Sequence, residues 1–108
     1  MSEQSLVAAI LNRFGSRPGV RLWRANVLVA RDHTGRVVRA GVTGQADISG
    51  ILAPSGVRVE IECKSPTGKQ SHAQRIWGDM IRKHGGIYVV ARCVEDVEEV
   101  LDGRHPSE

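Results

Sequence analysis

The segment that most constrains the fold is residues 57–64, VRVEIECK, in which apolar and polar side chains alternate without interruption. Successive side chains of a β-strand point to opposite faces, so this period of two predicts a strand. One face is apolar and is expected to point into the protein: Val59, Ile61 and Cys63. The other face carries Glu60, Glu62 and Lys64, which fits either a solvated sheet surface or a functional site.

The whole chain of 108 residues is expected to form a single α/β domain over residues 1–108. Helical spacing of apolar residues, short apolar runs and turn residues divide it into elements. In order, these are a helix over 3–14, strands over 20–30, 36–40, 46–53 and 57–64, a helix from Ser71 to about His84, a strand over 87–91 and a helix over 94–102. The order α-β-β-β-β-α-β-α predicts a mixed β-sheet flanked by helices.

Turn residues predict how the strands pair. Residues 32–35 (DHTG) would fold strand 36–40 back onto strand 20–30, and residues 54–56 (PSG) would join strands 46–53 and 57–64 in a hairpin. The uninterrupted apolar run over 87–91 is typical of a strand that is covered on both faces.

The helix that begins near Ser71 has a clear start signal and a clear apolar stripe. Ser71 and Gln74 have the spacing of a capping box, in which each side chain binds the other residue's backbone N–H. The residues expected on its buried stripe are Ala73, Ile76, Trp77, Met80 and Ile81. Trp23 and Trp77 are expected in the core rather than as platforms for base stacking.

Several features predict an intracellular protein. No apolar run approaches the ~18–20 residues that a membrane span needs, and the first residues lack the basic and apolar regions of a signal peptide. Cys63 and Cys93 form neither a disulfide framework nor a C-x-x-C pair. The expected compartment is therefore the reducing cytoplasm.

Charge is distributed unevenly along the chain. Residues 93–108 contain six of the 12 acidic residues and one of the 15 basic residues, so residues 1–92 carry a net charge of +8. This asymmetry fits a polyanionic partner, although a solvated surface explains it equally well. The basic residues predicted to contact the phosphates of such a partner are Lys69, Arg75, Arg82 and Lys83, for which a solvated surface is again an equal alternative.

Asp47 changes the interpretation of the polar strand face. In a hairpin that turns at residues 54–56, the start of one strand meets the end of the other, which places Asp47 beside Glu62 and Lys64. Two carboxylates that converge repel each other unless a cation lies between them. Oxygen ligands favour a hard ion, so the sequence predicts a site for Mg²⁺ or Mn²⁺.

Glu3 is a further candidate in the first helix. It shares the apolar stripe of that helix and is therefore expected to face the body of the protein. It is a candidate metal ligand through water, although a carboxylate that stabilises a helix N-terminus is the simpler explanation. The sequence assigns no role to Glu60 or His72.

Asp47 and, after fourteen residues, Glu62-Cys63-Lys64 match the D…(D/E)-x-K signature of the PD-(D/E)XK nucleases. Within that superfamily, the segments GQADISGI, VEIECKSPTGKQSHAQRIW and HGGIYVVARCVEDV resemble the VRR-NUC branch. The resemblance runs from Glu3 to about Val100. It departs from the pattern at Ala46, where the superfamily has proline, and at Cys63, where valine is more usual.

The resemblance implies a restriction-endonuclease-like core and a role for each matched residue. Asp47, Glu62 and the backbone carbonyl of Cys63 would hold the metal, and Lys64 would orient the attacking water or offset charge on the phosphate. Glu3 matches an acidic residue of the first helix. Gln74 matches a glutamine that supports the site, which does not exclude its capping role.

The implied activity is that of a Mg²⁺-dependent, structure-specific DNA endonuclease that leaves a 5′-phosphate and a 3′-hydroxyl. Stand-alone members resemble Holliday-junction resolvases that act as homodimers, so branched DNA and a second copy of the chain are the expected partners. Two alternatives stay open. One is a non-catalytic nucleic-acid-binding module, and the other is a small subunit of a larger phage or DNA-repair complex that docks through its acidic last helix.

Overall fold

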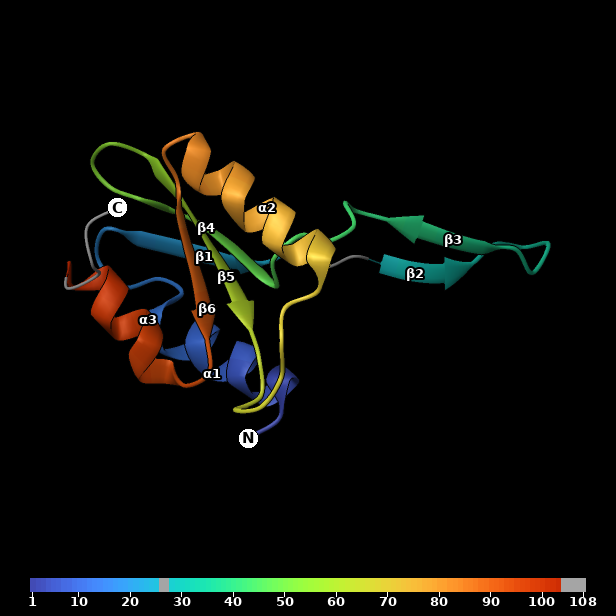
Figure 1. Ribbon diagram of the computed structural model, residues 1–108, viewed down its shortest axis with the longest axis horizontal. Helices are drawn as coiled ribbons and strands as arrows, with labels where there is room; N and C mark the ends of the chain where they lie inside the picture. The colour runs from blue at the N-terminus through green and yellow to red at the C-terminus, as the bar shows by residue number, and fades with distance from the viewer. Residues whose placement is uncertain (26–27, 104–108) are drawn as a thin grey trace.

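A four-stranded mixed sheet with the strand order β1-β4-β5-β6 forms the centre of the molecule (Figure 1). The computed structural model describes residues 1–25 and 28–103. The strands of this sheet are β1 (Val20–Arg24), β4 (Ile48–Leu52), β5 (Val57–Cys63) and β6 (Ile87–Ala91). The first three pair antiparallel, and β6 pairs parallel to β5. The α/β class and the mixed sheet are therefore confirmed.

Helices cover both faces of this sheet, as Figure 1 shows. They are α1 (Glu3–Phe14), α2 (His72–Lys83) and α3 (Val94–Leu101). The larger core lies between the sheet and the pair α1 and α3, and it contains the predicted apolar face of β5: Val59, Ile61 and Cys63. A smaller core lies under α2 and is built around Tyr88 and Ile81. No helix within the described ranges is both long and apolar enough to cross a membrane.

The local start and turn signals are confirmed. Ser71 and Gln74 form the predicted capping box at the start of α2. Strands β4 and β5 form the predicted hairpin, with Leu52 opposite Val57 and Ile48 opposite Ile61. The first helix has the predicted bounds, and Ser2 caps its N-terminus.

The prediction of one strand over residues 20–30 is wrong. The chain leaves the main sheet after Arg24, whose partner Ile48 is the first residue of β4. Strands β2 (Leu28–Arg31) and β3 (Val37–Ala40) then pair with each other in a separate two-stranded sheet. Residues 26–27, within the predicted strand, lie outside the described residues.

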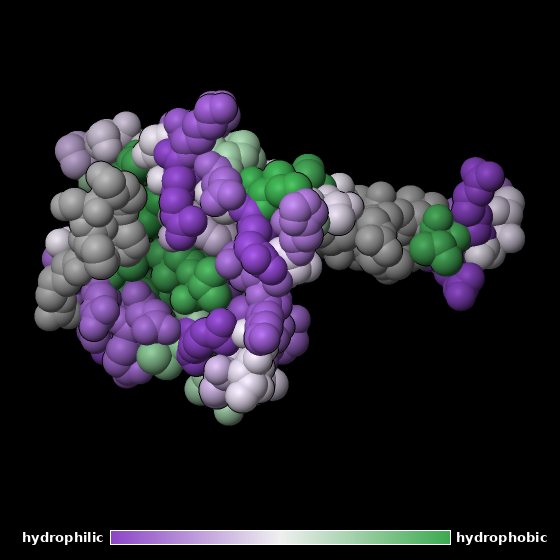
Figure 2. Space-filling view, in the orientation of Figure 1, coloured by the Kyte–Doolittle hydropathy of each residue, from purple (hydrophilic) through white to green (hydrophobic). Residues whose placement is uncertain are grey.

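The β2–β3 hairpin projects from the body as an arm (Figures 1 and 2). The molecule measures 49 × 30 × 28 Å, and its radius of gyration is 14.5 Å. A compact chain of this length is expected to have a radius of gyration of ~13 Å. The turn of the arm is held by Asp32, whose Oδ1 accepts hydrogen bonds from the backbone N–H groups of Thr34 at 2.8 Å and Arg36 at 3.0 Å.

Two expected core residues are exposed instead. Trp23 is 47% exposed because β1 is an edge strand, and its inward face carries Val20 and Leu22. Ile76 is 56% exposed although it continues the apolar stripe of α2. In the last helix, Val100 is buried although the sequence did not single it out.

Candidate active site

The hairpin between β4 and β5 brings Asp47 to the end of β5. Asp47 directly precedes β4, and its Oδ2 accepts a hydrogen bond from the backbone N–H of Cys63 at 2.8 Å. At the other edge of β5, where it pairs with β6, Glu62 is paired with Val90. The predicted convergence of Asp47 with the polar face of β5 is therefore present.

Glu62 is buried, with 2% of its surface exposed. Its Oε2 accepts a hydrogen bond from Nε2 of Gln74 at 3.0 Å and lies 3.8 Å from Nζ of Lys64. Its Oε1 is also buried but has no hydrogen-bond partner among the described residues. Among the described residues it is the one buried side-chain nitrogen or oxygen atom without a partner, and leaving a buried carboxylate oxygen unpaired is costly.

Glu60, two residues earlier on the same face, is buried as well but differs in its contacts. Its Oε1 accepts a hydrogen bond from Nε1 of Trp77 at 2.9 Å, and its Oε2 pairs with Nε of Arg58 at 2.7 Å. Both oxygens of Glu60 are therefore satisfied by protein groups, and its role is to tie β5 to α2. The interpretation of this strand face as a solvated surface is wrong, because α2 covers it.

The environment of Glu62 raises the pKa of its carboxyl group to about 8. Burial is the largest cause, because removal of water disfavours the charged form. The negative charge of Asp47 raises the pKa further, as does a hydrogen bond between the protonated carboxyl group and Asp47, whereas the ammonium group of Lys64 acts in the opposite direction. A cation between the two carboxylates would reverse this effect.

Cys63 packs into the larger core and is fully buried. Burial and the negative charge of Asp47 raise the pKa of its thiol to about 12. The side chain is therefore a neutral apolar group at physiological pH, and it supplies neither a nucleophile nor a thiolate ligand. Only the backbone of Cys63 is suited to the metal-binding role that the sequence suggested.

Glu3 and Lys64 are two further charged residues near Glu62. Glu3 is exposed rather than buried, and its Oε2 accepts a hydrogen bond from the backbone N–H of Ser65 at 3.3 Å. The charge of Glu3 is close enough to contribute to the raised pKa of Glu62. The side chain of Lys64 is only 11% exposed, so its ammonium group is held near the carboxylates.

The predicted phosphate-contacting residues separate into two groups. Lys69 and Arg75 line one depression together with Val90, which is paired with Glu62 in the β5–β6 ladder. Arg82 and Lys83 lie at the other end of α2, about 12 Å along the helix axis from Gln74. Arg82 packs over the ring of Tyr88, at 5.2 Å from the ring centre.

Sequence reasoning missed two arginines near the site. The Nη1 atom of Arg92 donates hydrogen bonds to the backbone oxygens of Ser65 at 2.6 Å and Gly68 at 2.7 Å. Arg24, at the end of β1, donates a hydrogen bond to Gln4 at 3.1 Å, and its charge opposes the raised pKa of Cys63. The position of Arg92 directly after a predicted strand was an available signal, whereas Arg24 lies inside the predicted strand over residues 20–30.

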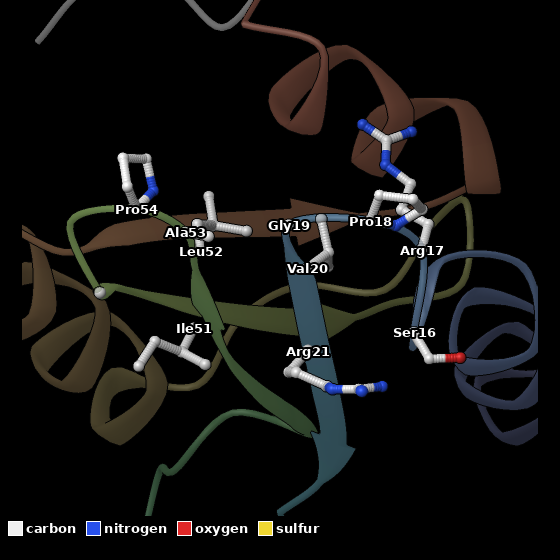
Figure 3. Close-up of a pocket in the computed structure, with 11 residues that line it drawn as sticks. Ser16, Arg17, Pro18, Gly19, Val20, Arg21, Ile51, Leu52, Ala53 and Pro54 are labelled. Atoms are coloured by element: carbon white, nitrogen blue, oxygen red, sulfur yellow. The ribbon is translucent and has the colours of Figure 1, made fainter.

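Within residues 1–25 and 28–103, no group of three or more His, Cys, Asp or Glu side chains is arranged to hold a metal ion. Any metal near Asp47 and Glu62 would therefore need backbone oxygens or water as additional ligands. A separate pocket of about 430 Å³ lies at the opposite end of the β4–β5 hairpin, between Val20, Leu52 and Pro54 (Figure 3). It is remote from both carboxylates.

Comparison of the chain with known protein families and with curated proteins finds no match.

Proposed function

We propose that this chain is a metal-dependent DNA endonuclease of the VRR-NUC type. The observation that carries the proposal is the difference between the two buried glutamates of β5. Glu60 has a partner on each oxygen, whereas Oε1 of Glu62 has none and the carboxylate of Asp47 is close by. Without a cation, the two acids avoid repulsion only when Glu62 holds a proton, as its pKa of about 8 indicates, and a bound metal ion would replace that proton.

The residues present fit a hard divalent cation such as Mg²⁺ or Mn²⁺. Asp47 and Glu62 supply carboxylate oxygens, and the unpartnered Oε1 of Glu62 is available as a metal ligand. The neutral thiol of Cys63 leaves its backbone carbonyl as the third proposed ligand. Glu3 is proposed to act through water, since its side chain is exposed and bonded to the loop after β5.

Each residue of the site then has a defined task in phosphodiester hydrolysis. A bound Mg²⁺ in such sites activates water and stabilises the leaving oxygen. Lys64 places a positive charge where negative charge develops on the phosphate oxygens, and its limited exposure keeps that charge effective. Gln74 fixes the carboxylate of Glu62 through its 3.0 Å hydrogen bond and is a positioning residue.

The arrangement of elements is compatible with the restriction-endonuclease-like core that the proposal requires. When the β2–β3 arm is treated as an insertion, the order becomes α1-β1-β4-β5-α2-β6-α3. Asp47, directly before β4, and Glu62 of β5 then lie at the same end of the sheet, and Gln74 in the first turn of α2 contacts Glu62.

Branched DNA and a homodimer follow from the same proposal. The basic residues near the site and the net charge of +8 over residues 1–92 support a polyanionic substrate. A domain of 108 residues with one site needs a second copy to cut two strands in a concerted manner.

The decisive experiment incubates the protein with labelled four-way, flap and linear DNA, in Mg²⁺ and in EDTA. We expect cleavage in Mg²⁺, with preference for the four-way substrate, and none in EDTA. Asp47→Asn should abolish cleavage, whereas Asp79→Asn, a change at an exposed acid of α2, should retain it. Equal cleavage by Asp47→Asn and the wild type would contradict the proposal.

One observation favours a non-catalytic nucleic-acid-binding module instead. The described residues contain no ready group of three metal-binding side chains. This alternative predicts binding to DNA that is the same in Ca²⁺ and EDTA, with no cleavage in Mg²⁺. The second alternative, docking through the acidic last helix, is less favoured, because Glu98 and Asp102 already pair with Arg13 and Arg17.

A further inference from the structure

A shallow cleft of about 370 Å³ lies on the α2 side of β6. Its lining residues are Lys69, Gln70, Arg75, Val90 and Arg92, and we refer to it as the basic cleft. No acidic residue described in the structure lines it. Figure 2 shows that the surface over α2 and the preceding loop is mainly hydrophilic.

The basic cleft lies directly beside the candidate active site. Val90, which lines the cleft, is the partner of Glu62 in the β5–β6 ladder. Adjacent strands are separated by about 4.8 Å, so Val90 and Glu62 have neighbouring backbones. Arg75 follows Gln74, whose side chain contacts Glu62. A ligand that fills the cleft therefore approaches the carboxylates from one side.

Hydrogen bonds hold the lining of the cleft in place before any ligand arrives. Nη1 of Arg92 is bonded to two carbonyl oxygens of the loop over residues 65–68. A guanidinium group has five N–H donors, and no acceptor in the described parts of the chain takes those on Nε and Nη2. Nε2 of Gln70 donates to the Tyr88 hydroxyl at 2.9 Å.

The cations of the cleft lack ion-pair partners in the described ranges, although Arg92 also lines a neighbouring depression that contains Asp96 and Glu99. Among the described residues, neither Lys69, Arg75 nor Arg92 forms an ion pair with a carboxylate. By contrast, Arg13, Arg17 and Arg58 each form an ion pair with a carboxylate. Three cations that face one depression, without an acid, are suited to a single tetrahedral anion.

We propose that the basic cleft binds one backbone phosphate of the nucleic acid, adjacent to the phosphate that is cleaved. This inference rests on the proposed nuclease function and adds a defined anchoring site to it. The cations contributed by the loop after β5, by α2 and by the residue after β6 converge on the same phosphate. Arg92 has two functions, since it also fixes the loop that begins at Ser65.

The first test measures affinity for a labelled four-way junction in Ca²⁺ at several salt concentrations. Arg75→Gln should weaken binding roughly 10-fold. A triple variant of Lys69, Arg75 and Arg92 to glutamine should weaken it by much less than the product of the single effects, since the three act on one group. Its salt slope should fall by about 1, the value for one phosphate.

Arg21→Gln is the matched control, because Arg21 is an exposed arginine on β1, beside the pocket of Figure 3. It should leave affinity and cleavage unchanged. A fall of the salt slope by about 3 in the triple variant, or equal effects of Arg21→Gln and Arg75→Gln, would overturn the single-phosphate site.

A second test separates the cleft from the nuclease function. Inorganic pyrophosphate is titrated into isotopically labelled protein without metal, and backbone amide shifts are followed by NMR. Shifts centred on residues 68–75 and 90–92 that disappear in Arg75→Gln support the cleft, even if the wild type cuts no DNA. The loop over residues 65–68 is held by Arg92 and not by Arg75, so we expect Arg75→Gln to retain the fold. Absence of these shifts in the wild type contradicts the proposal even if DNA is cleaved.

Discussion

Nε2 of Gln74 donates a hydrogen bond to Oε2 of Glu62 at 3.0 Å, while Oε1 of the same glutamine accepts one from the backbone N–H of Ser71 at 2.8 Å. One side chain therefore closes the first turn of α2 and holds the buried carboxylate. Formation of the helix start and placement of Glu62 are linked through this residue.

The two functions of Gln74 can be separated by comparing it with Ser71. Ser71→Ala removes only the cap and should cost about 1 kcal/mol of stability, with little change in cleavage. Gln74→Ala should cost a similar amount of stability and also lower the cleavage rate at least ~10-fold, because Glu62 loses its anchor. Chemical denaturation and single-turnover cleavage measure the two effects. Equal cleavage by both variants would show that Gln74 is only a cap.

Stability of the metal-free protein should decrease as pH rises. The pKa of Glu62 is about 8 in the folded protein and 4.5 in its ordinary state, so the folded form binds the extra proton between these values. Between pH 5 and 8 the free energy of unfolding should fall by at most ~1.4 kcal/mol per pH unit. Stability is retained below pH 4.5 and lost as the pH passes through 8.

Glu62→Gln should remove this dependence and make the protein more stable than the wild type at pH 8, measured by denaturation in EDTA. Glu60→Gln is the control from the same strand face. It should destabilise the protein, because Arg58 loses its charged partner. A pH profile of Glu62→Gln that overlays the wild type would show that another group causes the effect.

Metal binding should depend on Asp47. Calorimetric titration of Mn²⁺ should detect one site in the wild type and none in Asp47→Asn, which keeps an acceptor for the N–H of Cys63. Asp79→Asn should bind like the wild type, because Asp79 is exposed on α2. Retention of the site in Asp47→Asn would remove the main argument for a metal at this position.

Lys64 should affect the chemical step more than binding. Its ammonium group is 3.8 Å from Glu62 and is proposed to act where charge develops on the phosphate. Lys64→Ala should bind junction DNA within a few-fold of the wild type and cut it at least ~100-fold more slowly. Lys69→Ala should show the opposite division, with its larger effect on Kd. Wild-type cleavage by Lys64→Ala would leave this lysine a structural role alone.

Gly78 should be intolerant of a side chain despite its place in a helix. A Cβ atom there would lie 2.6–2.9 Å from three ring carbons of Tyr88. Alanine normally favours a helix over glycine by about 1 kcal/mol. Here Gly78→Ala should instead destabilise the protein by ~1–3 kcal/mol through overpacking. Asp79→Ala, at the exposed neighbour, should change stability by less than ~0.5 kcal/mol in thermal denaturation.

Features of the fold that depend on neighbouring residues in the chain could be predicted from the sequence. The alternation of residues 57–63, the hairpin at residues 54–56 and the capping box of Ser71 all act over a few residues. The inward face of β5 followed from the alternation alone. The approach of Asp47 to the end of β5 then followed from the hairpin register.

Features that depend on distant partners could not be predicted in this way. No residue within 20–30 indicates where pairing with β4 ends, so the start of the arm was missed. The burial of Glu60 requires α2 to cover that face of β5, and its satisfaction requires Trp77. The position of Arg92 depends on a loop that is more than 20 residues away in the chain.

The arm leaves and rejoins the body at almost the same point. Past the end of β1, the backbone N–H of Ala25 donates a hydrogen bond to the backbone carbonyl oxygen of Asp47 at 2.9 Å. Asp47 is the residue immediately before β4. Segments that start and end at neighbouring positions tolerate changes in length at low entropic cost. During evolution the arm can therefore lengthen, shorten or be replaced without a shift in strand register. The carboxylate of Asp47, where the arm rejoins the body, would stay in place while the sequence of the β2–β3 hairpin diversifies.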